Sequence, residues 1–238
     1  MARKQMVPCK LFEQHCGHLR HACIGIPTGK GLMGPIDAAL RGDKHWIKIR
    51  GTQVLRDALQ DFATTIIRVL GKCPTHCQEL VAMEPGYGGF CDASTLGARG
   101  VWFAGSKPLN PVVWRVEWPE DIQQNVVSFQ NPHGTITNLD LEMAGMVLHY
   151  LVVEHLVDLR HVHAAAWHDN TPTVSWTNKL SSSKSSMAGR LTRALAMRIH
   201  ANQASPHVSS VSIAGIQNLM ANVMSRTFSQ HTVSDNTS

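Results

Sequence analysis

The chain has 238 residues, of which 43% are hydrophobic and 16% are charged. This composition excludes a disordered chain, a collagen and a coiled coil, and the length allows one or two domains with a full hydrophobic core. Lys and Arg number 22 against 17 Asp and Glu, which gives a net charge of +5. That excess permits a polyanionic partner without requiring one.

The sequence contains no candidate membrane anchor. No stretch reaches the ~18 uninterrupted apolar residues that a spanning helix needs. The best one, residues 143–157, is interrupted by His149, Glu154 and His155. The first ten residues also lack the apolar block of a secretory signal. We therefore expect an intracellular protein, cytoplasmic or nuclear, with no membrane association and with its six cysteines as free thiols.

Residues 1–80 are predicted to form a small helical segment. Residues 10–24 are a His- and Cys-rich stretch of helical character, and apolar residues recur at helical spacing across 54–70. Between them lies a Gly- and Pro-rich run at 25–35. Its GIPTGKG sequence has the wrong spacing for a phosphate-binding loop, so we expect a flexible loop there.

Three cysteines of this segment, Cys9, Cys16 and Cys23, recur every seven residues. On a helix this spacing places them along one stripe. Zinc sites usually use short C-x₂₋₄-C pairs, and the pair Cys73 and Cys77 has no second pair of matching spacing. The cysteine spacing therefore favours packing over zinc binding.

From about residue 81 the pattern changes to β-strands. Runs at 86–94, 98–105 and 110–119, separated by Gly or Pro turns, predict an antiparallel meander. Asn138 is the expected N-cap of a helix over 139–157. The elements expected after it are a strand at 161–167, a helix at 185–201, a strand at 207–215 and a closing helix at 216–228. This order predicts an α/β domain with a mixed sheet.

Three acids fall where this architecture builds sites. Asp92 lies in the first strand run, Glu142 lies one turn into the long helix, and Asp169 follows the next strand. If they converge, they should raise one another's pKa unless a cation neutralises them. Oxygen ligands suit Mg²⁺ or Mn²⁺, and two such ions ~3.5–4 Å apart promote attack of water on a phosphodiester.

Each acid also has an ordinary structural explanation when it is taken alone. Asp92 could be a turn residue, Glu142 a solvated helix residue, and Asp169 the N-cap of a helix that begins near Thr171. Asp140 competes with Glu142 for the helix position, but an acid in the first turn simply favours the helix dipole. The metal-site hypothesis therefore rests on the three acids together.

Four sequence runs together resemble the ribonuclease H domain of retroelement polyproteins: GGFCDASTLGARGVWF, TNLDLEMAGMVLHYLVVE, AAWHDNTPTVSWTNKLSSSKS and SIAGIQNLMANVMSRTF. The resemblance covers about residues 81–228. It implies a ribonuclease H-like mixed sheet, with three antiparallel strands and then parallel strands, flanked by helices. It also implies that Asp92, Glu142 and Asp169 are catalytic and bind metal. The family's fourth acid follows an Asn by four residues, and here Asn222 occupies that position.

The activity that this resemblance implies is hydrolysis of the RNA strand of an RNA–DNA hybrid with two Mg²⁺ or Mn²⁺ ions. The amide of Asn222 can offer an oxygen but no negative charge, so we expect impaired activity. Two alternatives stay open at this point. The domain could be a catalytically inactive nucleic-acid-binding remnant, or an integrase or nuclease of the same fold that acts on DNA.

A hybrid substrate is held mainly through its phosphates and 2′-hydroxyls. The candidate contacts after Asp169 are Lys179, Ser181, Ser182, Ser183, Lys184, Arg190 and Arg193. Ser94 and Asn170, each beside one of the acids, are candidates for contacts near the scissile bond. An ordinary solvated face explains the basic residues equally well.

Residues 10–70 resemble the segment that links a reverse transcriptase to its ribonuclease H domain, through the H-L-R-H-A stretch and the W-I-K-I-R and L-R-D-A-L runs. The chain has no paired-Asp polymerase motif. We therefore expect a fragment or an independently expressed remnant, with a reverse transcriptase domain supplied elsewhere as a partner. The predicted organisation is a helical segment at 1–80, a ribonuclease H-like domain at 81–228 and a disordered tail at 229–238.

Overall fold

The computed structural model describes residues 6–25, 29–41, 45–48, 53–72, 84–104, 111–160, 162–180, 186–202 and 208–218. The chain divides into two compact units. The first unit comprises residues 1–83, 159–161 and 176–207, and the second comprises residues 84–158, 162–175 and 208–238. In the described part of the chain, no helix combines the length and the apolar character needed to cross a membrane.

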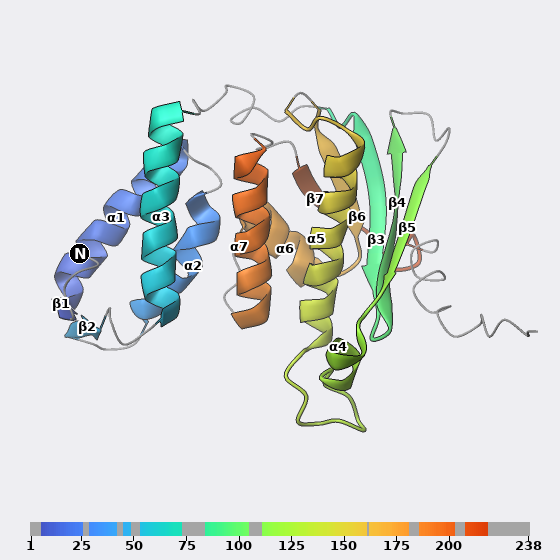
Figure 1. Cartoon of the computed structure of the whole chain (residues 1–238), viewed down its shortest axis with the longest axis horizontal. Coiled ribbons are helices and arrows are strands. Elements are labelled where there is room, and N and C mark those ends of the chain that lie inside the picture. The colour runs from blue at the N-terminus through green and yellow to red at the C-terminus, as the bar shows by residue number, and fades with distance from the viewer. Residues whose placement is uncertain are drawn as a thin grey trace, which may run out of the picture. The chain divides into compact units, whose positions relative to one another are not determined.

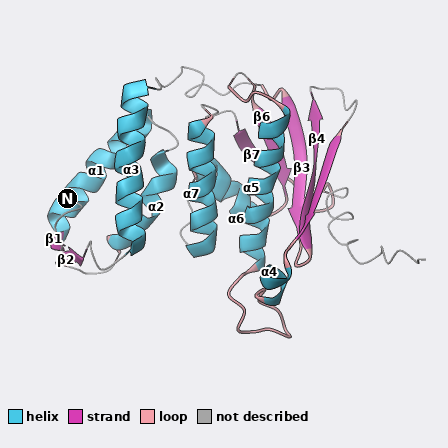
Figure 2. Cartoon of the chain, in the orientation of Figure 1, coloured by secondary structure: helices cyan, strands magenta, loops and turns pink. Residues whose placement is uncertain are grey.

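Helices dominate the first unit (Figure 2). Its elements are α1 (Cys9–Gly25), α2 (Lys30–Ala39), α3 (Gln53–Lys72), α7 (Ser186–Ala201) and a small antiparallel sheet of β1 (Met6–Pro8) and β2 (Trp46–Lys48). The helices predicted at 10–24, 54–70 and 185–201 are confirmed as α1, α3 and α7. The two short strands were not predicted, because three residues are too few to show alternation.

The buried side of α1 carries Phe12, Cys16 and Cys23, which confirms the predicted cysteine stripe. Burial raises the pKa of the Cys16 and Cys23 thiols to about 11, so both stay protonated. These side chains pack into the core of the first unit with Val7, Leu32, Met33, Ile36, Ile47, Leu55, Ala58 and Phe62.

The flexible loop expected at 25–35 is wrong from Lys30 onward, because α2 begins there. Pro35 lies inside this helix, where it removes one backbone donor. The apolar side chains that α2 buries are Leu32, Met33 and Ile36. The free energy gained by burying three large side chains exceeds the free energy lost with one hydrogen bond. The prediction of a loop considered only the Gly and Pro content and not this burial.

The second unit contains a mixed five-stranded sheet (Figure 1). Its order is β5-β4-β3-β6-β7, with β3 at Tyr87–Ala93, β4 at Gly97–Ala104, β5 at Val112–Glu117, β6 at Ala164–His168 and β7 at Val208–Ser212. The strands β3, β4 and β5 pair antiparallel, whereas β6 pairs parallel to β3 and β7 pairs parallel to β6. The predicted meander and the two later strands are therefore confirmed.

The long helix α5 (Asn138–Leu156) packs on β3 and β4. Gly145 permits this close approach, since a Cβ there would lie 3.2 Å from the Cβ of Ala93 and 3.5 Å from that of Ala98. The next residue, Met146, contacts Cys91 of β3 through their sulfur atoms at 3.9 Å. The helix thereby presents its N-terminal turns to the end of β3.

The N-cap of α5 is Thr137 rather than the predicted Asn138. The Thr137 hydroxyl accepts a hydrogen bond from the backbone N–H of Asp140, and the Asp140 carboxylate accepts one from the backbone N–H of Thr137. This reciprocal capping box uses the side chain of Asp140. A threonine followed three residues later by an acid is a sequence signal that the single-residue argument for Asn138 overlooked.

The mixed sheet with flanking helices is a ribonuclease H-like fold, as the sequence predicted. Two short helices complete the described elements, α4 (Glu120–Gln124) and α6 (Thr171–Lys179). In the range predicted as a closing helix, 216–228, Ile216 and Gln217 form a turn, and residues from 219 on lie outside the described residues, as does the tail predicted at 229–238. The domain limits of 1–80 and 81–228 stay a prediction, although α7 groups with the first unit.

Candidate active site

The sheet brings two of the predicted acids to the same edge. Asp92 is the penultimate residue of β3, and Asp169 directly follows β6. Since β3 and β6 are parallel neighbours, their carboxyl ends lie side by side. Glu142 reaches the same place from α5, where its Oε2 accepts a hydrogen bond from the backbone N–H of Ala93 at 3.3 Å.

Glu142 is the most strongly perturbed acid of this cluster. Its side chain is 6% exposed, and its Oε1 accepts a 3.4 Å hydrogen bond from Nδ2 of Asn138. Burial, together with the negative charges of Asp92 and Asp169, raises the pKa of Glu142 to about 8, against the lowering effect of the bonds from Ala93 and Asn138. Asp92 and Asp169 therefore act electrostatically on Glu142, in the direction that the sequence predicted for a cluster in need of a cation.

A fourth ionisable group, His168, completes the cluster and was not predicted. It is fully buried at the end of β6, and its Nδ1 accepts a hydrogen bond from the backbone N–H of Asn170 at 3.0 Å. Its Nε2 lies 3.4 Å from Oε2 of Glu142, and its Nδ1 lies 3.7 Å from Oδ1 of Asp169. Burial lowers the pKa of His168 to about 4, despite the opposing effect of Asp169. The only sequence signal was its position beside Asp169.

The donor set suits a hard divalent cation, although the acids do not form a closed cage. Among the described residues, no three His, Cys, Asp or Glu side chains are already arranged to hold a metal ion. Mg²⁺ often binds through one or two carboxylates and keeps several waters or substrate phosphate oxygens. The buried Glu142, whose pKa is raised by burial and by the charges of the two neighbouring acids, fits an ion bound in that open manner.

Asn170 has a structural role beside the cluster. Its Oδ1 accepts a 3.0 Å hydrogen bond from the backbone N–H of Thr173, which makes it the N-cap of α6. The alternative that Asp169 caps this helix is therefore wrong, and the Asp169 carboxylate is left to the cluster. The candidate contact of Asn170 near the scissile bond stays a prediction, with the side-chain oxygen of Asn170 engaged in the cap.

Ser94 likewise organises the chain next to Asp92. Its backbone N–H donates to the carbonyl of Gly97 at 2.8 Å, and its hydroxyl accepts from the backbone N–H of Leu96 at 3.3 Å. Its carbonyl accepts a 2.8 Å hydrogen bond from the indole of Trp118. Ser94 thus closes the turn between β3 and β4, directly after Asp92 and Ala93.

The segment after β7 also leads back to the cluster. Asn218 is 1% exposed, and its Nδ2 donates to the carbonyl of Cys91 at 3.2 Å, next to Asp92. A Cβ at Gly215 would lie 3.2 Å from Oδ2 of Asp169. This segment therefore passes close to two acids at the point where the sequence continues toward Asn222, which lies outside the described residues.

The predicted basic contacts do not belong to the second unit where they are described. Lys179 and Arg190 are exposed and belong to the first unit, as does Arg193. Arg193 forms an ion pair with Asp61 of α3, which engages its guanidinium inside that unit. The candidates that lie outside the described residues are Ser181, Ser182, Ser183 and Lys184.

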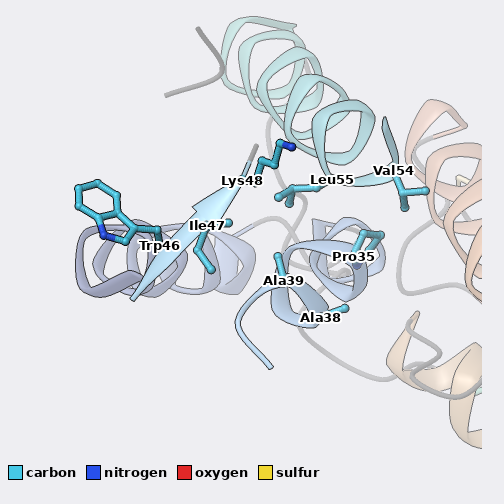
Figure 3. Close-up of a pocket in the computed structure, with 8 residues that line it drawn as sticks. All are labelled: Pro35, Ala38, Ala39, Trp46, Ile47, Lys48, Val54 and Leu55. Carbon is cyan, nitrogen blue, oxygen red and sulfur yellow. The ribbon is translucent and has the colours of Figure 1, made fainter. Parts of the chain in front are cut away.

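A separate pocket of about 390 Å³ lies in the first unit between α2, β2 and α3 (Figure 3). Its lining residues are Pro35, Ala38, Ala39, Trp46, Ile47, Lys48, Val54 and Leu55. The walls are mostly apolar, and Lys48 is the single charged residue of this lining. The pocket therefore lacks the acidic donors that metal-assisted hydrolysis needs.

Comparison with known proteins gives structural neighbours only. No protein-family model and no curated protein sequence matches the chain. The N-terminal ribonuclease H domain of a Mycobacterium tuberculosis protein, solved as a fusion with maltose-binding protein, aligns at 13% identity over 58% of this chain and 92% of its own, with a TM-score of 0.38. A foamy viral protease-reverse transcriptase in complex with double-stranded DNA aligns in two structures at 12% and 10% identity, with TM-scores of 0.33 and 0.30. These alignments cover 87% and 89% of this chain but 34% and 42% of the viral chains.

Proposed function

We propose that the second unit is a metal-dependent nuclease of the ribonuclease H type, which hydrolyses the RNA strand of an RNA–DNA hybrid. The observation that carries this proposal is the buried Glu142, whose pKa Asp92 and Asp169 raise across the ends of β3 and β6. The proposal also uses the sequence resemblance to retroelement ribonuclease H domains. It includes a reduced activity, since Asn222 replaces the family's fourth acid.

The three acids would hold one or two Mg²⁺ or Mn²⁺ ions. Bound ions of this kind lower the pKa of a water molecule and stabilise the charge that develops on a phosphate. The chain itself contributes the arrangement of the ligands. Ala93 and Asn138 donate to the Glu142 carboxylate, and the turn closed by Ser94 fixes the end of β3 beside Asp92.

The proposed partner is nucleic acid, with a reverse transcriptase domain supplied elsewhere as a second partner. The exposed cations Lys179 and Arg190 support contacts to phosphate, and the net charge of +5 favours a polyanion. Phosphate contacts release counterions, so the affinity for a hybrid should fall steeply as salt is raised. Affinity that stays constant between low and moderate salt would contradict this part of the proposal.

A second candidate function is a nucleic-acid-binding module without nuclease activity. It is favoured by the lack of a preformed three-ligand group among the described residues and by Asn222 in the fourth position. The loss of one carboxylate weakens metal binding without altering the sheet. The two candidates therefore make the same prediction for nucleic-acid binding and opposite predictions for cleavage.

The deciding experiment incubates the protein with labelled RNA–DNA hybrid, duplex RNA or duplex DNA in Mg²⁺ or Mn²⁺. Metal-dependent cleavage of the hybrid that Asp92→Asn abolishes supports the nuclease. Asp121→Asn, at an exposed acid of α4, is the matched control and should keep the activity. Binding without cleavage supports the inactive module, whereas cleavage of duplex DNA supports an integrase-like or DNA-directed nuclease.

A further inference from the structure

We infer that His168 is a positioning residue, whose ring Nε2–H holds Oε2 of Glu142 in the orientation that metal binding requires. This inference rests on the proposed function, because it assigns a role toward the metal ligands of the same site. It is independent of the resemblance that suggested the acids, since His168 was not among the residues which that resemblance implied.

The tautomer of the ring follows from its neighbours. The backbone N–H of Asn170 can only donate, so Nδ1 of His168, 3.0 Å away, must be the unprotonated nitrogen. The neutral ring then carries its proton on Nε2. That nitrogen is buried without an aligned hydrogen-bond partner among the described residues, and Oε2 of Glu142 lies 3.4 Å from it. A small rotation of the carboxylate converts this contact into a hydrogen bond.

This contact leaves the two oxygens of Glu142 unequally occupied. Oε2 faces two donors, the backbone N–H of Ala93 at 3.3 Å and Nε2 of His168 at 3.4 Å. Among the described residues, Oε1 accepts a hydrogen bond from the side-chain amide of Asn138 alone, at 3.4 Å. Because each carboxylate oxygen accepts about two hydrogen bonds, Oε1 keeps capacity for a cation while Oε2 is held by the protein.

A second fully buried histidine in the same unit shows what a purely packing role looks like. His149 is stacked on Trp102 with ring centroids 4.0 Å apart, and its Nδ1 accepts a hydrogen bond from the indole of Trp114. Within the described part of the chain, its ring lies against the indoles of Trp102 and Trp114 and beside Gly89 and Gly100. His168 differs because its two nitrogens lie 3.4 Å and 3.7 Å from two candidate metal ligands.

Two substitutions separate the functions of the two ring nitrogens. In His168→Asn the shorter amide retains an acceptor for the N–H of Asn170 but has no donor that reaches Glu142. In His168→Gln the longer amide places an N–H near the position of Nε2. A matched control is His163→Asn, at a half-buried histidine just before the same strand, whose Nε2 lies 2.9 Å from the hydroxyl of Ser209.

The experiment measures the affinity of the full chain for Mn²⁺ by calorimetry, with circular dichroism to verify folding. We expect His168→Asn to weaken Mn²⁺ binding about tenfold, which is typical of the loss of a group that orients a metal ligand. His168→Gln and His163→Asn should stay within about twofold of the wild-type affinity. Folded His168→Asn protein with wild-type affinity, or equal losses in the Asn and Gln variants, overturns the inference.

Nitrogen NMR of the metal-free protein gives a test that does not depend on metal binding. We expect a protonated Nε2 and an unprotonated Nδ1 for His168, and a shift of the Nε2-bound proton in Glu142→Gln. If the wild type binds no Mn²⁺, the proposed metal site fails, and the resonances alone decide the contact between His168 and Glu142. A ring protonated on Nδ1 in the wild type overturns the inference even if no variant folds. A proton resonance that is unchanged in folded Glu142→Gln protein overturns it as well.

Discussion

The indole Nε1 of Trp114 on β5 donates a hydrogen bond to Nδ1 of His149 on α5 over 2.9 Å, at the centre of the packed face of the sheet. Two glycines make room for the ring, since a Cβ at Gly89 or Gly100 would lie 2.6 Å or 2.7 Å from its nitrogens. The bond fixes His149 in a neutral form, and burial lowers its pKa well below 6.5. The core of the second unit therefore contains a basic group that cannot be protonated without unfolding.

The free energy of unfolding should rise with pH up to about 6.5. The unfolded chain protonates His149 and His168 near 6.5, whereas burial lowers both pKa values in the folded protein, that of His168 to about 4. The unfolded state thus binds more protons below 6.5, and stability is lost as the pH falls. Urea unfolding at pH 5, 6 and 7 measures this slope. His149→Phe should reduce it, and an unchanged slope in that variant would contradict the assignment.

Above pH 6.5 the sign reverses because of Glu142. Its pKa is about 8 in the folded protein against 4.5 for an ordinary glutamate side chain, so the folded state holds the extra proton and stability falls as the pH rises toward 8. At about 1.4 kcal/mol per pKa unit, the rise from 4.5 to about 8 corresponds to an upper limit of about 5 kcal/mol, so Glu142→Gln should raise the free energy of unfolding at pH 8.5 by up to about 5 kcal/mol. The control Glu117→Gln, at an exposed position of β5, should change it little. Equal effects of the two substitutions would refute the raised pKa of Glu142.

Sequence patterns predicted the helices and strands that have strong periodicity. They failed where contacts between distant residues determine whether an element forms or where a side chain lies. The meander was predictable because Gly and Pro punctuate its strands. The preference for Glu142 over Asp140 as a metal ligand stays a prediction, and the carboxylate of Asp140 serves the capping box of α5. The helix α2 was missed because local rules for Gly and Pro ignore the apolar side chains that it buries. His168 was missed because its neighbours in the sequence do not distinguish it from a histidine that only packs in the core. Its contact is with Glu142, which lies 26 positions earlier in the chain (168 − 142).

Removal of the N-cap of α6 should destabilise the second unit without removing an acid. Asn170→Ala deletes the oxygen that accepts the backbone N–H of Thr173 and should cost about 1 kcal/mol, whereas Asn170→Ser retains a cap and should cost a few tenths. Urea unfolding checks both values. Asp169→Asn leaves the capping bond of Asn170 in place and should therefore cost less free energy of unfolding than Asn170→Ala. A larger loss in Asp169→Asn than in Asn170→Ala would contradict the assignment of the cap to Asn170.

Close packing of α2 against α7 should make Gly31 intolerant of a side chain. A Cβ at Gly31 would overlap the Cβ of Ala196 and lie 3.0 Å from the carbonyl of Leu180. We expect Gly31→Ala to lower the free energy of unfolding of the first unit by about 2 kcal/mol, within the range for overpacking. Adding Ala196→Gly to that variant should recover part of the loss.

The matched control for this prediction is Gly17→Ala, on the exposed side of α1, where a Cβ meets nothing within 4 Å. Alanine favours a helix over glycine by about 1 kcal/mol, so this variant should be more stable than the wild type. Thermal unfolding compares the three variants. If Gly31→Ala is as stabilising as Gly17→Ala, the packing of α2 on α7 is wrong.

Restoring a carboxylate at Asn222 should strengthen the metal-dependent activity. Unit charges 4 Å apart interact by about 4 kcal/mol at an effective dielectric of 20, so the neutral amide forfeits a large part of the attraction for a divalent ion. We expect Asn222→Asp to raise cleavage of a hybrid at least about tenfold at limiting Mg²⁺, and to lower the Mn²⁺ concentration needed for half-maximal rate. Gln130→Glu adds the same charge at an exposed loop residue and should leave both quantities unchanged. Because Asn218 ties this segment to Cys91 beside Asp92, a variant that cleaves no faster than the wild type would show that position 222 takes no part in the site.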